Sequence, residues 1–142
     1  KIKTIYSVEC CPIKTTEIPK NSIICTATTS QLPVFFDDEI PSGCHINAIG
    51  SYQPHTREIP SNTIMRSKII VDHFDSCTRE AGDLIIPKKQ NGWSFKNIYC
   101  EIGALVLGLK PSRENNKEVT LFKSVGNAMQ DLAVVNHIMQ KL

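Results

Sequence analysis

The chain has 142 residues, about the size of one domain, and its composition is that of a globular protein, with 41% hydrophobic and 21% charged residues. The formal net charge of +2 is too small and too scattered to indicate nucleic-acid binding. No apolar run reaches the roughly 18 residues of a membrane helix, and no signal-peptide pattern opens the chain. We therefore expect a cytoplasmic protein with neither nucleic acid nor membrane as a partner.

Short β-branched segments are the first structural signal along the chain. Residues 22–27, 45–50 and 68–72 are apolar runs rich in isoleucine, and a similar run follows at 119–122. Continuous apolar runs of this length are typical of strands in a sheet that is covered on both faces. We predict four such strands.

Helical patterns lie between these segments. Ser61 is placed to cap a short helix that runs to about Arg66, and Asp75 or Ser76 is placed to open another that ends near Gly82. The alternation of strands with helices predicts an α/β fold with a mainly parallel sheet and flanking helices.

Two longer helices are predicted in the second half of the chain. Apolar residues at helical spacing indicate a helix capped by Ser94 that ends at Gly108. The clearest helix covers residues 127–140, where apolar residues recur at three- and four-residue steps. These residues are Ala128, Leu132, Val135, Ile138 and Met139.

The cysteines and histidines show no metal-binding pattern. The six cysteines contain no CxxC, and the four histidines form neither HxH nor HExxH. Cys25, Cys44 and Cys100 lie in apolar stretches, where a free thiol behaves as a small hydrophobic group. We predict reduced, structural cysteines and no metal site.

The residues that leave the strands are the first candidates for function, because parallel α/β sheets bind ligands at the carboxyl ends of their strands. The first strand leaves through hydroxyl-rich residues 26–30, which suit close approach to a ribose or phosphate. The second leaves through residues 47–52, where Gly50 permits a sharp bend or a backbone packed against a planar ligand. Each segment alone is also typical of an ordinary turn.

Other polar residues have simpler interpretations. Asp72 ends the third strand and could orient a ribose or a substrate amine, although helix capping is the favoured interpretation. Arg57 and Glu58 are interpreted as a surface ion pair. Glu80 and Asp83 are interpreted as solvated turn residues.

Taken together, these segments resemble the ornithine cyclodeaminase/μ-crystallin family in order and spacing. The resemblance rests on CTATTS at 25–30, PVF at 33–35, GCHINAIG at 43–50, RE at 57–58, VD at 71–72, EAGD at 80–83 and LFKSVG at 121–126. It implies an oxidoreductase that uses NAD or NADP and acts on amino-acid imines, such as a ketimine reductase or an alanine dehydrogenase. It also implies a Rossmann domain and a separate domain for substrate binding and dimerisation.

The resemblance covers only part of such a protein. Family members are much longer, this chain begins with Lys1 rather than Met, and none of its seven glycines forms the GxG of a dinucleotide-binding turn. We therefore expect residues 1–142 to be one domain with a partial Rossmann-like fold: the later part of an NAD(P)-binding domain followed by the C-terminal helix. Tight dinucleotide binding would then need a completing segment or partner chain.

The resemblance assigns six residues to the site by position. The residues assigned to cofactor binding are Thr28, Ile49, Gly50, Ser51 and Ser124, and Val125 is assigned to the substrate. No residue is assigned a catalytic role.

Two departures from the family pattern bear on the reaction. Tyr52 and Thr56 stand where ornithine cyclodeaminases carry an aspartate that handles protons and a lysine that contacts the substrate carboxylate. Because tyrosine has a pKa of about 10 and is a poor base at neutral pH, imine reduction fits better than cyclodeamination. The alternatives are a non-catalytic μ-crystallin-like binding protein, a truncated relic, or an ornithine cyclodeaminase.

We also expect a homo-oligomer. The apolar face of the last helix would otherwise be exposed to water, and a second copy of the chain could bury it.

Overall fold

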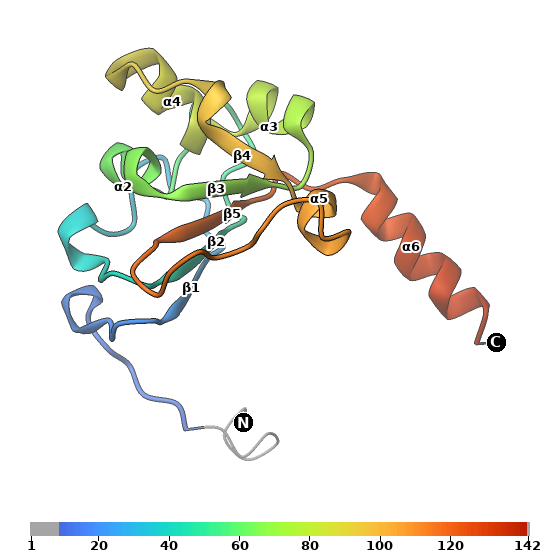
Figure 1. Ribbon diagram of the computed structural model, residues 1–142, viewed down its shortest axis with the longest axis horizontal. Helices are drawn as coiled ribbons and strands as arrows, with labels where there is room; N and C mark the ends of the chain where they lie inside the picture. The colour runs from blue at the N-terminus through green and yellow to red at the C-terminus, as the bar shows by residue number, and fades with distance from the viewer. Residues whose placement is uncertain (1–8, 142) are drawn as a thin grey trace.

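The structure is a computed structural model that describes residues 9–141. Its centre is a five-stranded sheet in the order β1-β2-β5-β3-β4, in which every neighbouring pair is parallel. The last strand along the chain therefore lies in the middle of the sheet (Figure 1). The strands are β1 (Ile23–Thr26), β2 (His45–Ala48), β3 (Lys68–Val71), β4 (Ile98–Glu101) and β5 (Thr120–Lys123). The predicted α/β fold with a parallel sheet is confirmed.

Three helices cover one side of the sheet in Figure 1, namely α2 (Ser61–Arg66), α3 (Phe74–Glu80) and α4 (Gly82–Asn91). The short helix α5 (Ile102–Val106) follows β4, and α6 (Ala128–Met139) runs away from the sheet to the C-terminus. Single 3₁₀ turns lie at Thr15–Glu17, Asp37–Glu39 and Phe95–Asn97. Among residues 9–141, no helix is both long enough and apolar enough to span a lipid bilayer.

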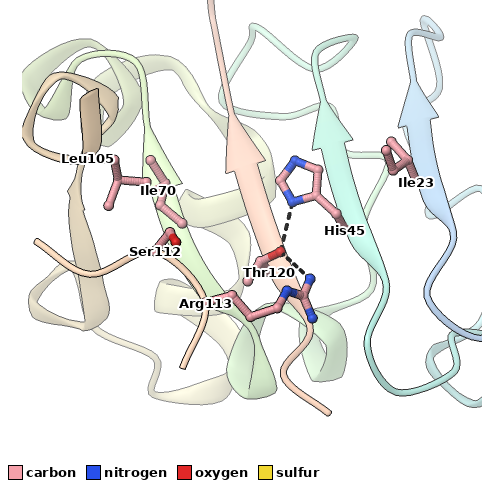
Figure 2. A pocket seen from close by; sticks show the side chains of 7 residues that line it. All are labelled: Ile23, His45, Ile70, Leu105, Ser112, Arg113 and Thr120. Carbon is pink, nitrogen blue, oxygen red and sulfur yellow. Dashed lines mark hydrogen bonds between the residues drawn. The ribbon is translucent and has the colours of Figure 1, made fainter. Parts of the chain in front are cut away.

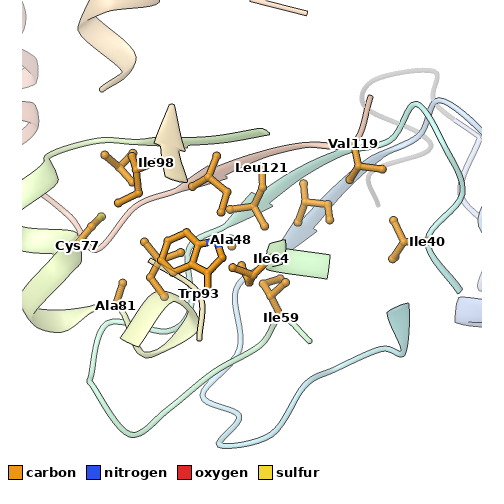
Figure 3. Close-up of a cluster of buried hydrophobic side chains, with 14 of the residues drawn as sticks. Ile40, Ala48, Ile59, Ile64, Cys77, Ala81, Trp93, Ile98, Val119 and Leu121 are labelled. Carbon is orange, nitrogen blue, oxygen red and sulfur yellow. The ribbon is translucent and has the colours of Figure 1, made fainter. Parts of the chain in front are cut away.

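The hydrophobic core lies between the sheet and this helical layer (Figure 3). Ile46, Ile69 and Leu121 from three adjacent strands are completely buried, as are Ile64 of α2 and Leu84 of α4. Burial of each such side chain contributes about 1.5–3 kcal/mol relative to exposure. This packing holds the central strands and the helices together.

The sheet is not covered on both faces at its β1 edge. Ile23 is 73% exposed and Cys25 is also exposed, whereas Thr26 is buried. Alternate residues of a strand point to opposite faces. The expectation of a sheet covered on both faces is therefore wrong for β1, and Cys25 is not a core residue. Cys44 and Cys77 are buried.

Helix α4 was not expected from the sequence. Pro87 lies inside it and removes one helical hydrogen bond, which argues against a helix when the sequence is considered alone. Leu84 and Ile85 of α4 are buried against the core, so tertiary packing outweighs the local cost. The helix ends at Asn91, and its C-cap Gly92 has a left-handed φ of 69°.

The single helix expected from Ser94 to Gly108 is wrong. Ser94 caps only one 3₁₀ turn, by accepting a hydrogen bond from the backbone N–H of Lys96 at 3.3 Å. Strand β4 then pairs with β3, with Ile98 opposite Ile69, before α5 begins. The same apolar residues are compatible with a helix or with a strand, and pairing with β3 at the edge of the sheet favours the strand.

Two of the predicted helix starts also differ in detail. Ser61 is the first residue of α2, and its N-cap Pro60 makes no side-chain capping bond. The cap of α3 is His73, which accepts from the N–H of Ser76. The expectation for the last helix is confirmed, because Asn127 caps α6 by accepting from the N–H of Met129 at 3.0 Å.

Candidate functional site

Three loops meet at the carboxyl edge of the sheet, because β1, β2 and β5 are neighbours and parallel. The structure brings the six predicted site residues together in these loops, immediately after the strand ends. Their exposure differs: Thr28 and Ile49 are exposed, Gly50 and Val125 are half-buried, and Ser51 and Ser124 are buried.

The side chain of Glu58 joins the first two loops. One carboxylate oxygen accepts the backbone N–H of Thr28 at 2.5 Å, and the other accepts the N–H of Gly50 at 2.9 Å and the hydroxyl of Thr26 at 2.8 Å. Glu58 is completely buried. The interpretation as a surface ion pair is therefore wrong, and Arg57 instead donates to the hydroxyl of Ser61.

Glu58 is held in its ionised form by these donors. Burial raises the pKa of the carboxyl, but the hydrogen bonds from Thr28, Thr26 and Gly50 outweigh it and hold the pKa below its ordinary value of 4.5. At neutral pH the group is a carboxylate that can only accept hydrogen bonds. This suits a residue that gathers N–H and O–H groups from two loops.

Gly50 allows these two loops to approach each other closely. A Cβ atom at this position would collide with the backbone N and O of Thr28 and with the carboxylate of Glu58. The absence of a side chain at Gly50 therefore serves the contact between the β1 and β2 loops.

Asp83 and Lys123 form a buried ion pair behind Glu58. One oxygen of Asp83 accepts the backbone N–H groups of Glu58 at 2.7 Å and Ile59 at 2.9 Å. The other lies 3.0 Å from the ammonium of Lys123, which also donates to the carbonyl oxygen of Ala48. Asp83 and Lys123 are both completely buried, so the interpretation of Asp83 as a solvated turn residue is wrong.

Asp72 holds the third loop. One of its oxygens accepts the hydroxyl of Ser124 at 2.6 Å and the N–H groups of Val125 and Gly126 at 3.1 and 3.2 Å. The other accepts from the N–H of His73 and from the thiol of Cys77. Asp72 is therefore not a helix cap, because it fixes the loop after β5.

The charge of Asp72 affects its neighbour. Burial raises the pKa of Asp72, but the hydrogen bonds from Ser124, Cys77 and the backbone outweigh it and lower the pKa below 3.8. Burial and the adjacent Asp72 carboxylate raise the pKa of the Cys77 thiol. Cys77 is thus a neutral, inert donor rather than a nucleophile.

The hydroxyl groups of Ser51 and Ser124 are engaged in hydrogen bonds within the protein. The hydroxyl of Ser51 donates to the carbonyl oxygen of Thr56 at 2.6 Å, and that of Ser124 is occupied by Asp72. Tyr52 is 57% exposed. At this edge of the sheet the loops therefore expose backbone groups and the side chains of Thr28 and Ile49.

The hollow in Figure 2 lies elsewhere. It is lined by the first residues of three strands, Ile23, His45 and Thr120, and therefore lies toward the opposite ends of the strands. Thr120 is hydrogen-bonded to both His45 and Arg113, and Arg113 also donates to the carbonyl of Glu118. The polar side chains of His45, Arg113 and Thr120 in this hollow are therefore engaged in hydrogen bonds within the fold. Within residues 9–141, no group of three or more His, Cys, Asp or Glu side chains is arranged to hold a metal ion.

A parallel sheet in which the loops after neighbouring strands gather at the carboxyl edge is the arrangement of a Rossmann-like α/β protein, and solved Rossmann-like relatives share it. The family model of the ornithine cyclodeaminase/mu-crystallin family matches residues 3–142. The chain belongs to this family.

Glu58 and Asp83 support these loops but are not among the site residues predicted from the sequence. Their only signal in the sequence is their place in the RE and EAGD segments of the resemblance.

Individual relatives support the same assignment. A Δ1-pyrroline-2-carboxylate reductase of Bacillus cereus is 36% identical over 125 residues, which are 87% of this chain and 38% of that protein. The Δ1-pyrroline-2-carboxylate reductase of Thermococcus litoralis, solved with NADH and L-proline, is 42% identical with a TM-score of 0.74 over 77% of this chain and 34% of that one. An archaeal alanine dehydrogenase dimer with bound NAD is 30% identical with a TM-score of 0.76, over 84% and 38%. This chain spans well under half the length of these relatives.

Proposed function

We propose that the protein is an NAD(P)-dependent oxidoreductase that reduces amino-acid imines, and that this chain supplies loops on the nicotinamide side of the cofactor site. The observation that carries the proposal is the meeting of the β1, β2 and β5 loops at one sheet edge, in a chain 42% identical to a reductase solved with NADH. The substrate screen described below distinguishes this function from a cyclodeaminase and from a non-catalytic binding protein.

The residues present fit the nicotinamide half of a dinucleotide. Thr28 and Ile49 are exposed at the edge, and the backbone of Gly50 is held beside Thr28 by Glu58. We assign cofactor contacts to these three residues, to Ser51 through its backbone and to Ser124, and a substrate contact to Val125. The bound cofactor would supply a hydride to the carbon of the C=N bond. The pyrophosphate turn must come from other residues, since no GxG occurs in this sequence.

Imine reduction makes the smallest demand on the side chains of this chain. The reaction adds a hydride to carbon and one proton to nitrogen, so it needs one proton source and a site for the carboxylate. Tyr52 and Thr56 replace the acidic and basic residues of the cyclodeaminases, and Thr56 is engaged with Gln53. We therefore rank ornithine cyclodeaminase, and a non-catalytic mu-crystallin-like binding protein or relic, below the reductase.

The same proposal includes the choice of cofactor, the location and the assembly. Either NAD or NADP would fit the residues of this chain, because the 2′ position of the ribose is recognised elsewhere in a Rossmann domain. We place the protein in the cytoplasm. We propose a homo-oligomer, for which a dimeric relative and the exposed apolar face of α6 are the support.

The first experiment is a substrate screen of the full-length protein. Oxidation of NADH and NADPH is followed with Δ1-pyrroline-2-carboxylate, other cyclic ketimines, and linear imines formed from 2-oxo acids and ammonia. We expect one cyclic imino acid to give the highest kcat/KM. Dinucleotide binding without turnover on any imine would favour the binding protein, and release of ammonia from ornithine would favour the cyclodeaminase.

A further inference from the structure

Glu58 differs from an ordinary core residue in what its side chain contacts. It lies near the end of the segment between β2 and α2, and its three donors come from the end of β1, the loop after β1 and the start of its own segment: Thr26, Thr28 and Gly50. A buried carboxylate without such donors would be strongly destabilising. Its cost is therefore offset only while the β1 and β2 loops stay where they are.

The main chain of Glu58 is fixed as well as its side chain. Its N–H donates to Asp83 at 2.7 Å, and its carbonyl oxygen accepts the N–H of Val34 at 2.8 Å. Asp83 is in turn held by Lys123 at 3.0 Å. Because Lys123 belongs to the central strand, Glu58 is connected rigidly to the sheet, and the loops it binds take their positions from it.

From this geometry we infer that Glu58 is a positioning residue for the dinucleotide, acting through the backbones of Thr28 and Gly50. The inference rests on the proposed function. The loop after β5, which carries Ser124 and Val125, is held by Asp72 instead. Each of the two carboxylates therefore controls a different part of the site, and loss of Glu58 should affect cofactor binding without affecting the substrate side.

The substitution that isolates this role is Glu58→Gln in the full-length protein. Glutamine keeps one acceptor oxygen and the same shape, but its NH₂ group would face an N–H donor. The β1 and β2 loops would then lose one of their two backbone anchors. A hydrogen bond to a buried charged group is worth about a tenfold change in affinity or more. We expect the KM of the reduced dinucleotide to rise about tenfold, and the KM of the imine to stay within about twofold.

Matched variants separate positioning from folding. Glu80→Gln makes the same charge change on the exposed surface of α3 and should leave both KM values unchanged. Thr26→Val removes only the hydroxyl donor to Glu58 and should raise the dinucleotide KM in the same direction by a smaller factor, so it replaces Glu58→Gln if that variant fails to fold. A purely structural role would reduce the amount of folded, active enzyme and leave the KM values of the folded fraction unchanged.

The outcomes are distinguishable. A selective rise in the dinucleotide KM supports the inference. Unchanged KM values in folded Glu58→Gln, or in Thr26→Val when the first variant does not fold, overturn it, as does an equal rise in both KM values. A wild-type protein that binds no dinucleotide overturns the proposed function first, before any variant is made, and the positioning role falls with it.

Discussion

Glu58 and Asp72 solve the same local problem at two places along the sheet edge. A chain that leaves a parallel strand no longer pairs its N–H groups with a neighbouring strand, and buried N–H groups must find another acceptor. Glu58 accepts one backbone N–H group from each of two such loops, and Asp72 accepts two from a third. Hydrogen bonds to an ionised acceptor are stronger than those between neutral groups, so these loops are held firmly.

Asp72 gives the stability of the protein a pH dependence that Asp72→Asn should remove. Its pKa in the folded protein lies below the ordinary value of 3.8, so the stabilisation is complete above pH 3.8 and is lost as the pH falls through the folded pKa. We expect Asp72→Asn to lower the free energy of unfolding by about 1–3 kcal/mol at neutral pH. The difference from wild type should shrink below pH 3.8.

Urea unfolding followed by circular dichroism at a series of pH values measures this difference. Asp75→Asn, at an exposed position on the neighbouring helix α3, is the control and should show little effect at any pH. A loss for Asp72→Asn that is equally large at acidic and neutral pH would show that the ionised form of Asp72 contributes nothing.

At the residue scale, the sequence predicts that Thr28 and Gly50 lie in loops after strand ends, but not what holds these loops. Both residues follow apolar strands and match a family segment. Glu58 looks like a surface residue next to Arg57, since its partners Thr28 and Gly50 lie 30 and 8 residues earlier in the chain. No local pattern reports contacts at that separation.

At the element scale, the strands with continuous apolar runs are predictable, and the elements defined by tertiary packing are not. The strands β1, β2, β3 and β5 were expected within two residues of their observed ends. Helix α4 contains Pro87 and is stabilised by burial of Leu84 and Ile85, which no local pattern reports. The segment that forms β4 has helical as well as strand character, because Ile98 and Ile102 also have helical spacing. The position of β5 at the centre of the sheet follows from packing, not from chain order.

The buried pair Lys123–Asp83 joins two elements, β5 and α4, and its loss should be costly. Lys123→Met would leave one oxygen of the Asp83 carboxylate without a partner, because among residues 9–141 that oxygen has no hydrogen bond and only Lys123 as an ionic contact. We expect a loss of about 3–5 kcal/mol in the free energy of unfolding.

A double-mutant cycle with Asp83→Asn tests the pair. Asparagine keeps an acceptor for the N–H groups of Glu58 and Ile59 but removes the charge, so the double variant should recover part of the loss. Urea unfolding of the four proteins gives the coupling energy. Strictly additive losses would mean that Lys123 and Asp83 stabilise the fold independently.

At the scale of the whole molecule, the covered and uncovered surfaces are sharply divided. The helical layer buries one face of the sheet, but no residue of α6 is buried. The apolar face of α6 is predictable from the sequence, because the spacing of Leu132 and Val135 indicates an apolar stripe on a helix. What lies against the stripe was not predictable, since that depends on residues far from it or on another chain.

The exposed stripe of α6 predicts self-association of the isolated chain. Leu132, Val135 and Ile138 are 49%, 53% and 52% exposed, and they lie on one side of the helix. Apolar surface that is concentrated in one patch favours contact with a second copy, because burying it removes the surface from water.

The aspartate substitutions Leu132→Asp and Val135→Asp should shift the chain toward monomer in sedimentation velocity at tens of micromolar. Gln130→Asp, on the opposite side of α6, should leave the distribution unchanged. Because no residue of α6 is buried, the variants should also unfold at the same urea concentration as wild type when both are dilute enough to be monomeric. A wild-type chain that sediments as a monomer, with both variants losing stability, would instead place the stripe against the chain's own sheet.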